Sequence, residues 1–534
     1  MVLEKIQKEN DIKKLTPQEL ELLKDEIRQF LIESISVTGG HLASNLGVVE
    51  LTMALHLCFN LPKDKIVWDV GHQSYTHKIL TGRKDGFSSL RQYGGMSGFP
   101  KADESDCDCF NTGHSSTSIS AGLGLATARQ VTGEDYHVVS VIGDGALTGG
   151  MAYEALNNAS SVKGNFIIVL NDNNMSISEN VGGISQYLSG FRTADAYRDF
   201  KNNVMNSLNH IPIYGERMVK HIRNTKSSIK QLFIPGMFFE EMGIIYLGPV
   251  DGSDIKEMCR VFDEAKRVDG PVLVHVLTKK GSGYGPAERY PSRFHGAEPF
   301  VIETGLPKNK RTKANYTDVF STVMKKLGER NPKVVAITAA MADGTGLRRF
   351  HRNFPDRFFD VGIAEAHATT FAAGLAKAGL IPVFAVYSSF LQRAFDQILH
   401  DVCIQNLHVI FAIDRAGLVG SDGETHQGIF DISYLSVIPN MTIMAPKNKW
   451  ELSDMMKFAV AYDGPIALRY PRGAAYDDLK EIRQPIELAK SELIRKGSTV
   501  AIMALGSKEK TDVDVVKLLE ADGISATHNI ARFE

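Results

Sequence analysis

Polar residues that could bind a metal ion and phosphate follow two apolar runs in the stretch 136–178. Asp144 stands in a Gly-Asp-Gly turn after the run 137–142, and an Asn-Asp-Asn-Asn turn begins at Asn171 after the run 165–170. A hard divalent cation prefers oxygen ligands from carboxylates, amides, carbonyls and substrate phosphates. The stretch therefore predicts a Mg²⁺ and phosphate site, and its protein ligands would be Asp144, Asn173 and the backbone carbonyl of Met175.

The two apolar runs predict parallel strands joined by a helix over residues 148–161. Continuous runs rich in Val and Ile are typical of parallel strands covered on both faces. In an open parallel sheet the ligand crevice lies outside the carboxyl ends of the strands. We therefore expect both polar turns in one crevice, where the N-terminus of the following helix favours phosphate charge.

Two other phosphate-binding motifs do not match the sequence. A dinucleotide fingerprint G-x-G-x-x-G needs glycine where the chain has Thr148, and the G-K-[ST] of a Walker loop is absent. For Gly-Asp-Gly alone, an ordinary strand–turn–helix with Asp144 as a cap remains an alternative. The amide-rich turn at the end of the next strand argues against that interpretation.

Composition narrows the class of protein. The 534 residues carry a formal net charge of −2, so nucleic acid and anionic membranes are not expected as main partners. No apolar run approaches a membrane span, and the charged N-terminus is unlike a signal peptide. The five cysteines contain no C-x-x-C, which favours reduced thiols and a cytoplasmic location. Cys107 and Cys109 are interpreted as ordinary thiols, since no second pair completes a metal site.

The distribution of apolar runs predicts an α/β protein of doubly wound parallel sheets in three domains. The first is expected over residues 1–305 and the second over 315–480, with a polar linker between them. The third, 490–534, has two strands, too few for an independent parallel domain, and is expected to be the truncated start of a larger one. Residues 186–235 are basic and are interpreted as a solvated helical excursion.

Histidines in turn-like segments form a second group of candidates. They lie beside Gly, Ser or Tyr and not on apolar helix faces: His41, His72, His77, His114 and His295. One such histidine is usually a structural hydrogen-bonding group, whereas several near strand ends favour a polar active site. No H-x-H or H-E-x-x-H spacing supports zinc.

Arginines in the turns of the second domain predict a phosphate-and-sugar site. They are Arg393, Arg415, Arg469 and Arg472, and they accompany a D-G-x-T-H loop that contains Asp422 and His426. Arginine suits bidentate recognition of phosphate, although a single arginine is usually a surface residue or an ion-pair partner. Glu365, near a predicted helix start, would by itself be a favourable partner of the helix dipole.

The spacing of G-D-G and N-N resembles the diphosphate-binding motif of thiamine diphosphate enzymes. Four longer motifs look like the 1-deoxy-D-xylulose-5-phosphate synthase family, and the resemblance runs essentially end to end: G-D-G-A-L-T-G-G-M-A, N-D-N-x-M-S-I-S, G-H-Q-S-Y and D-R-A-G-L-V-G-x-D-G. It implies a transketolase-like fold with a diphosphate-binding domain (1–305), a pyrimidine-binding domain (315–480) and the start of a transketolase C-terminal domain (490–534). It also implies thiamine diphosphate and Mg²⁺ as cofactors, and a homodimer in which the two cofactor-binding domains of one subunit meet.

The resemblance assigns roles to individual residues. The implied cofactor contacts are His72, Gly113, His114, Ser115, Gly145, Ala146, Asn173, Tyr284 and Glu365. Glu365 would hydrogen-bond the aminopyrimidine ring, His41 and His72 would transfer protons and orient substrate, and His295 would reach the substrate. The implied contacts of the phosphorylated aldehyde are Tyr387, Arg393, Arg415, Asp422, His426, which also counts as catalytic, and Arg472, for which Arg469 is the alternative. The chain departs from the family pattern at Thr76, usually Pro, and at Ala366, usually Gln.

The implied reaction joins pyruvate, after loss of CO2, to D-glyceraldehyde 3-phosphate. The product, 1-deoxy-D-xylulose 5-phosphate, would feed non-mevalonate isoprenoid, thiamine and pyridoxal synthesis. One alternative is a transketolase-type enzyme with a ketose phosphate donor, against which the D-R-A-G-L-V-G and G-H-Q-S-Y motifs argue. A second is a cofactor-binding protein without catalysis, against which the intact Asp144, Asn173 and Glu365 argue.

Overall fold

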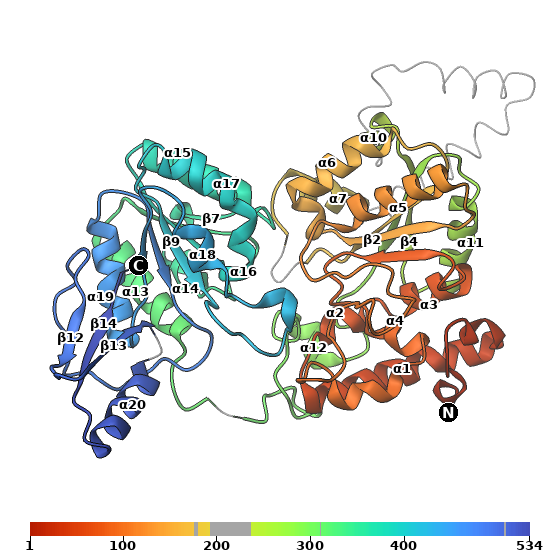
Figure 1. The fold of residues 1–534 in the computed structure, drawn as a ribbon. Helices are drawn as coiled ribbons and strands as arrows, with labels where there is room; N and C mark the ends of the chain where they lie inside the picture. The colour runs from red at the N-terminus through yellow and green to blue at the C-terminus, as the bar shows by residue number, and fades with distance from the viewer. Residues whose placement is uncertain (176–179, 193–236, 310, 507–508, 534) are drawn as a thin grey trace, which may run out of the picture. The chain divides into compact units, whose positions relative to one another are not determined.

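The computed structural model describes residues 1–175, 180–192, 237–309, 311–506 and 509–533. The chain divides into two compact units, Met1–Lys308 and Asn309–Glu534 (Figure 1). The expectation for residues 186–235 falls mostly on 193–236, outside the described residues. None of the helices in the described ranges is long and apolar enough to cross a membrane.

The first unit contains a five-stranded sheet in which every strand is parallel to its neighbours, as predicted for a doubly wound α/β fold. Its strands, in spatial order, are β1 (Lys65–Trp68), β2 (Val138–Gly143), β3 (Phe166–Asp172), β5 (Pro271–Leu277) and β4 (Ile245–Asp251). Because β2 and β3 are neighbours, the Gly-Asp-Gly and Asn-Asp-Asn-Asn turns lie at the same edge of the sheet.

Alternate strand residues bury against helices on opposite faces of this sheet. Val139 and Val169 belong to a core with α3 (Val49–Cys58) and α11 (Ile255–Ala265). Ile142 and Leu170 belong to a second core with α5 (Ser118–Thr132) and α6 (Gly150–Ala159) (Figure 1). Each fully buried aliphatic side chain contributes about 1.5–3 kcal/mol. The covered sheet therefore gives the turns at its edge a rigid base.

A third core in the first unit forms around its N-terminal helix. α1 (Pro17–Thr38) begins with a capping box, in which Glu19 N–H donates to Thr16 Oγ1 (3.3 Å) and Thr16 N–H donates to Glu19 Oε2 (2.8 Å). Its buried face packs with the short helices α2 (Leu42–Leu46), α4 (Tyr75–Leu80) and α12 (Gly285–Arg289). These helices adjoin the His41, His72 and His295 segments.

The second unit contains a six-stranded parallel sheet. Its spatial order is β10 (Thr442–Met444), β11 (Ile466–Arg469), β9 (Ile410–Asp414), β8 (Ile381–Tyr387), β6 (Val334–Thr338) and β7 (Phe358–Asp360). Helices α13 (Tyr316–Arg330) and α19 (Lys449–Ala461) share a core with its strands, while α15 (Glu365–Lys377) packs on β8 and β6 (Figure 1). Shorter helices of the second unit are α14 (Arg348–Asn353), α16 (Ser388–Leu391), α17 (Phe395–Gln397), α18 (Asp431–Leu435) and the π-helix Ile398–Cys403, and those of the first unit include α7 (Gly183–Arg192) and α10 (Met237–Glu241).

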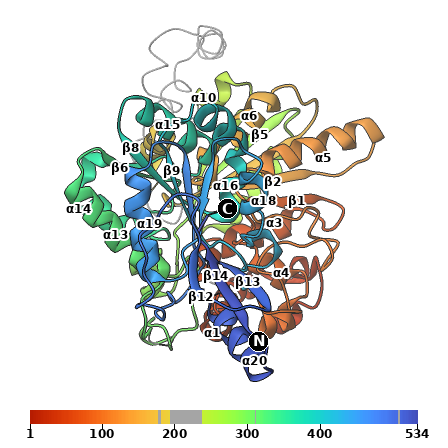
Figure 2. The ribbon, with the colours of Figure 1, turned by 60° about the vertical axis from the view of Figure 1, so that its left-hand side comes forward.

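A separate three-stranded sheet completes the second unit. Its strands are β12 (Glu492–Arg495), β14 (Ala526–Ala531) and β13 (Val500–Leu505), with α20 (Glu509–Ala521) alongside (Figure 2). Buried charges join it to α19: Arg532 donates to Glu451 (2.8 Å) and to Glu492 (2.6 Å), and Lys447 pairs with both carboxylates. Residues 492–531 thus form a small sheet tied to the second unit, with three strands where two were predicted and with β12 antiparallel to β14.

Candidate active site

Three of the predicted histidines lie together in the first unit. The ring centroids of His41 and His72 are 5.4 Å apart, those of His41 and His295 are 5.8 Å apart, and those of His72 and His295 are 5.0 Å apart. They come from three segments far apart in the sequence: the turn after α1, the turn after β1, and the loop after α12. Groups that accept or donate protons near neutral pH therefore meet within one small volume.

Lys280 lies beside this cluster and was not predicted as a site residue. Its Nζ is 3.4 Å from Nδ1 of His295. Burial lowers the pKa of the Lys280 ammonium to about 8, while the charge of Asp144 acts in the opposite direction. The sequence contained a signal, since Lys280 lies three residues after the end of β5 in a K-K-G-S-G turn, but lysines in turns are usually solvated.

The Gly-Asp-Gly turn is bonded to the end of the neighbouring strand. The backbone N–H of Asp144 donates to the carbonyl of Asn171 (3.1 Å), and the N–H of Gly145 donates to Oδ1 of Asp144 (3.0 Å). Asp144 is only 2% exposed, and a buried carboxylate is stable only when paired or bound to a cation. The carboxylate of Asp144 is a suitable ligand of a hard cation such as Mg²⁺.

Asp172 and Asn173 of the next turn have different environments. Asp172 is buried, and its Oδ2 is 3.0 Å from Nε2 of His275, whose Nδ1 is 2.8 Å from the hydroxyl of Tyr246. Asn173 is half-buried, and its Oδ1 accepts the N–H of Met175 (3.1 Å). Among the described residues no group of three or more His, Cys, Asp or Glu could hold a metal. The predicted ligand set of one carboxylate, one amide and one carbonyl stays a prediction.

The Gly113–Ser115 segment is tied to the same edge of the sheet. Both oxygens of buried Asp69 accept backbone N–H groups, from Ser116 (2.7 Å) and Ser118 (2.9 Å). The Ser116 hydroxyl donates to the carbonyl of Ala146 (2.7 Å). The structure thus ties the residue after Ser115 to Ala146, and the roles of Gly113, His114, Ser115, Gly145 and Ala146 toward the cofactor stay a prediction.

Two other residues lie apart from these turns. Tyr284 donates its hydroxyl to the carbonyl of Ile302 (2.6 Å), and its ring packs against Phe294 and Phe300, so its role toward a cofactor stays a prediction. His77, one of the five histidines grouped from the sequence, is fully buried in a separate polar network. Its Nε2 is 2.9 Å from Asp108.

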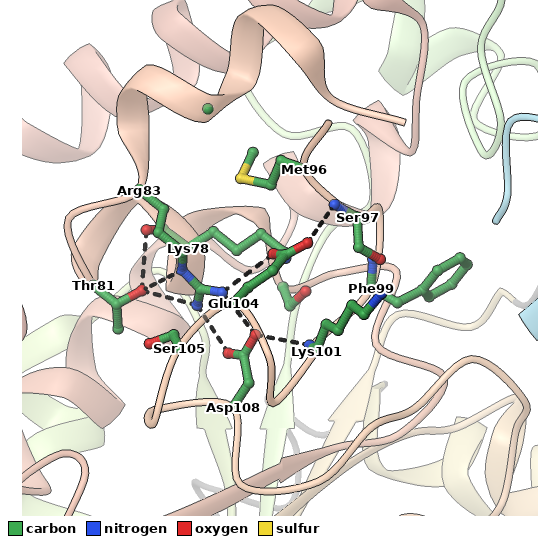
Figure 3. A network of polar contacts seen from close by, with 12 residues as sticks. Lys78, Thr81, Arg83, Met96, Ser97, Phe99, Lys101, Glu104, Ser105 and Asp108 are labelled. Carbon is green, nitrogen blue, oxygen red and sulfur yellow. Dashed lines mark hydrogen bonds and ion pairs between the residues drawn. The ribbon is translucent and has the colours of Figure 1, made fainter. Parts of the chain in front are cut away.

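This second network fixes the loop 94–112 (Figure 3). Arg83 binds Asp108 through two hydrogen bonds (2.7 and 2.8 Å), and buried Lys78 pairs with Glu104. The two carboxylates also accept loop N–H groups, from Lys101 to Asp108 (2.8 Å) and from Ser97 to Glu104 (2.6 Å). The loop in turn places Phe99 against the His41 ring, with centroids 5.6 Å apart.

In the second unit, Glu365 is the first residue of α15 and is buried. Burial raises the pKa of its carboxyl, and the charge of Arg393 acts in the opposite direction. A carboxyl with a raised pKa can share a proton with a ring nitrogen.

Four of the predicted substrate residues gather around Tyr387. The Arg415 guanidinium lies 4.2 Å from the Tyr387 ring centre, and Phe390 stacks on that ring at 5.6 Å while meeting His426 edge-on at 5.4 Å. Burial raises the pKa of the Tyr387 hydroxyl, and the charge of Asp422 acts in the same direction. The charges of Arg415 and Arg472 lower this pKa, so these three charged groups act on Tyr387 from nearby.

The loop 417–428, which carries Asp422 and His426, is closed at its base. Gly417 N–H donates to Gly428 O (2.5 Å) and Gly428 N–H donates to Gly417 O (2.9 Å). Inside it, the Gln427 side chain accepts the N–H of Val419 and donates to Gly423 O, both at 2.7 Å.

The structure separates the two candidate arginines of β11 and the turn after it. Arg469 is held by buried Asp431, to which its Nε donates at 2.8 Å. Arg472 is exposed and reaches the loop 417–428, where it donates to Ser421 Oγ (3.3 Å). Arg469 is thus paired with a buried carboxylate, whereas Arg472 lies at the loop that carries Asp422 and His426.

Comparisons with known proteins match the two units in turn. Residues 3–278 match the family model described as 1-deoxy-D-xylulose-5-phosphate synthase, and residues 312–477 match that of the transketolase pyrimidine binding domain. A protein named 1-deoxy-D-xylulose-5-phosphate synthase from Lachnoclostridium phytofermentans is 57% identical over all of this chain and 85% of its own length. Proteins with the same name are 55% identical in Natranaerobius thermophilus (100% of this chain, 85% of that protein) and in Caldanaerobacter subterraneus (98% and 84%).

The parallel sheets and these matches define a transferase of the transketolase type. Within that class the chain belongs to the 1-deoxy-D-xylulose-5-phosphate synthase family.

Proposed function

We propose that the protein catalyses the thiamine diphosphate-dependent condensation of pyruvate with D-glyceraldehyde 3-phosphate. One proton is consumed, CO2 is released, and the new carbon–carbon bond gives 1-deoxy-D-xylulose 5-phosphate. The observation that supports this most is the grouping of His41, His72 and His295 in a chain of this family. Loss of CO2 and attack on an aldehyde both require protons to move at substrate oxygen atoms, which imidazoles can do near neutral pH.

The residues at the edge of the first sheet would hold the cofactor. Asp144, Asn173 and the Met175 carbonyl would bind Mg²⁺, which would neutralise the diphosphate charge. The remaining contacts would come from His72, Gly113, His114, Ser115, Gly145, Ala146 and Tyr284. When bound, thiamine diphosphate supplies the carbon nucleophile and the electron sink that decarboxylation needs.

In the second unit, Glu365 would hydrogen-bond the far nitrogen of the aminopyrimidine ring. Its buried carboxyl with a raised pKa suits this role, because it holds a proton more readily than an exposed glutamate. The phosphorylated aldehyde would be bound by Tyr387, Arg393, Arg415, Asp422, His426 and Arg472. Arginine pairs with phosphate through two parallel hydrogen bonds, which fixes the orientation of the substrate.

We further propose a homodimer in the cytoplasm whose product serves isoprenoid, thiamine and pyridoxal synthesis. All five cysteines are free, which agrees with a reducing compartment. The remainder of this proposal rests on family membership.

A coupled assay tests the proposed reaction. Purified protein is given thiamine diphosphate and Mg²⁺, and CO2 release from labelled pyruvate is measured with and without D-glyceraldehyde 3-phosphate. We expect CO2 release and a new ketose phosphate only when both substrates and the cofactor are present. Product formed from a ketose phosphate donor in place of pyruvate would favour the transketolase alternative, and cofactor binding with no product from either donor would favour a non-catalytic protein.

A further inference from the structure

We propose that Asn45 is a positioning residue that sets the distance and orientation between His41 and His72. Asn45 lies in α2 and is fully buried. Its Nδ2 donates one hydrogen bond to the carbonyl of His41 (2.6 Å) and another to the carbonyl of His72 (2.8 Å). One amide group therefore joins the two segments that carry these histidines.

The third contact of the Asn45 side chain extends this arrangement to Tyr75. The Oδ1 of Asn45 accepts the backbone N–H of Tyr75 (2.8 Å). The Tyr75 hydroxyl lies 3.3 Å from the backbone nitrogen of His41 and 3.3 Å from its Nδ1. Asn45 thus holds the main chain of Tyr75, and the Tyr75 side chain contacts the His41 ring.

The chemistry of the amide explains why asparagine occupies this position. Two donors on one nitrogen and an acceptor on the neighbouring oxygen are needed, and of side chains this short only asparagine supplies them. Aspartate has the same size and keeps the acceptor, but as a carboxylate it would turn an oxygen toward two carbonyl oxygens. When protonated, its single O–H could restore one of the two bonds.

The inference rests on the proposed function only in so far as His41 and His72 act on substrate. Displacing a catalytic group by about 1 Å can cost about 100-fold in rate. We therefore expect Asn45→Asp to lower kcat by about 10- to 100-fold, with a smaller change in KM for pyruvate. Activity should recover in part as the pH is lowered and the new carboxyl takes up a proton, whereas the wild type should show no such gain.

A second readout needs neither cofactor nor turnover. Diethyl pyrocarbonate modification of individual histidines, followed over pH by peptide mass spectrometry, reports the accessibility and protonation of each ring. In Asn45→Asp the modification rates of His41 and His72 should both rise. Tyr75→Phe removes only the hydroxyl and should raise the rate of His41 alone. Asn157→Asp, on the exposed face of α6, is the matched control and should change neither rate.

The outcomes separate the inference from the proposed function. Wild-type modification rates in Asn45→Asp, or a uniform loss of activity with no change in pH profile, would overturn the positioning role. Altered rates in a protein whose wild type does not convert pyruvate would support the positioning role and overturn the proposed function. If Asn45→Asp does not fold, Tyr75→Phe decides: an unchanged His41 rate rejects the arrangement.

Discussion

Glu365 is a buried carboxyl for which we propose a contact to the aminopyrimidine ring. Water would favour its ionised form, but α15 begins inside the protein and burial raises the carboxyl pKa. We expect Glu365→Ala to abolish turnover, a loss of at least about 100-fold, because no other group would hold a proton at that point. Diphosphate-dependent binding of thiamine diphosphate should largely remain, as measured by calorimetric titration.

Glu365→Gln is the matched variant, because it keeps the shape and loses the titrating proton. It should bind the cofactor as well as the wild type and turn over at the same low rate as Glu365→Ala. Wild-type turnover in either variant would remove the proposed role.

At the residue scale, the sequence indicated which side chains could take part in chemistry but not which residues contact one another in the fold. His41, His72 and His295 were placed near an active site by their turn-like surroundings, and the structure brings their rings together. Asn45 and Lys280 were not selected, because their roles depend on groups 15–30 residues away in the chain that meet them only after folding. Local sequence carries no signal of such pairing.

At the scale of elements, the buried network on the loop 94–112 makes stability depend on pH (Figure 3). Burial alone would raise the pKa of Asp108, but hydrogen bonds from Arg83 and His77 outweigh it and hold the pKa well below its usual value. A carboxyl whose pKa is lower in the folded state stabilises the fold above about pH 4, and this contribution is lost as the pH falls below that value. His56 also belongs to this network, since its Nε2 is 2.9 Å from Nδ1 of His77. Burial lowers the pKa of both imidazoles, so the fold loses further stability as the pH falls below about 6.5.

Asp108→Asn should therefore lower the free energy of unfolding at pH 7 by about 3 kcal/mol, because Arg83 would lose a buried partner. The difference from the wild type should narrow as the pH falls below about 4. Urea unfolding at several pH values measures both effects. Asp135→Asn, at an exposed ion pair with Lys63, is the control and should cost less than about 1 kcal/mol. Equal costs for the two variants at pH 7 would contradict the argument.

The loop 417–428 depends on a glycine at its base. A Cβ added to Gly428 would lie 2.1 Å from the carbonyl oxygen of Arg415, closer than atoms can approach. We expect Gly428→Ala to open the loop and raise KM for D-glyceraldehyde 3-phosphate by about 10-fold or more, since Arg415 and His426 would be displaced.

Gly374→Ala is the matched control for this loop variant. Gly374 lies inside α15 with no atom within 4 Å of an added Cβ, so alanine should add up to about 1 kcal/mol of stability. Its KM should be that of the wild type. An unchanged KM in Gly428→Ala would separate the loop from substrate binding.

Strands with continuous apolar sequences were predicted well, whereas an irregular strand at the edge of the sheet was not. β2 and β3 lie within one or two residues of the predicted runs 137–142 and 165–170, because buried parallel strands require continuous apolar runs. β4 was missed because it contains Gly248-Pro249, has an irregular register there and is half-exposed at the sheet edge. Proline in a strand is confined to such edges and bulges, where the apolar pattern is weak.

At the scale of the whole molecule, each unit has its own sheet and its own cores. A change in the buried charges of the second unit should therefore leave the first intact. Arg532→Met would leave Glu451 and Glu492 short of a cation and should destabilise the second unit by about 3 kcal/mol.

Hydrogen exchange followed by mass spectrometry can measure this selectivity. Protection should fall in β12, β13, β14 and α19 and stay unchanged in β1, β2 and β3. Arg495→Met, at a partly exposed ion pair with Glu520, is the control and should have little effect. Equal loss of protection in both units would show that they unfold together.

The buried charges around Arg532 also set an order for assembly during synthesis. Glu492 follows Lys447 by 45 residues, and Arg532 follows Glu451 by 81 residues. At about 5–20 residues per second, Arg532 leaves the peptidyl-transferase centre about 4–16 s after Glu451. The first unit ends at Lys308, so it can bury its cores while the ribosome is still translating the second unit. The second unit can complete its charge pairing only after Arg532 has left the exit tunnel. Nascent chains stalled with Arg532 inside the tunnel should therefore be less protease-resistant than chains released with Arg532 outside it.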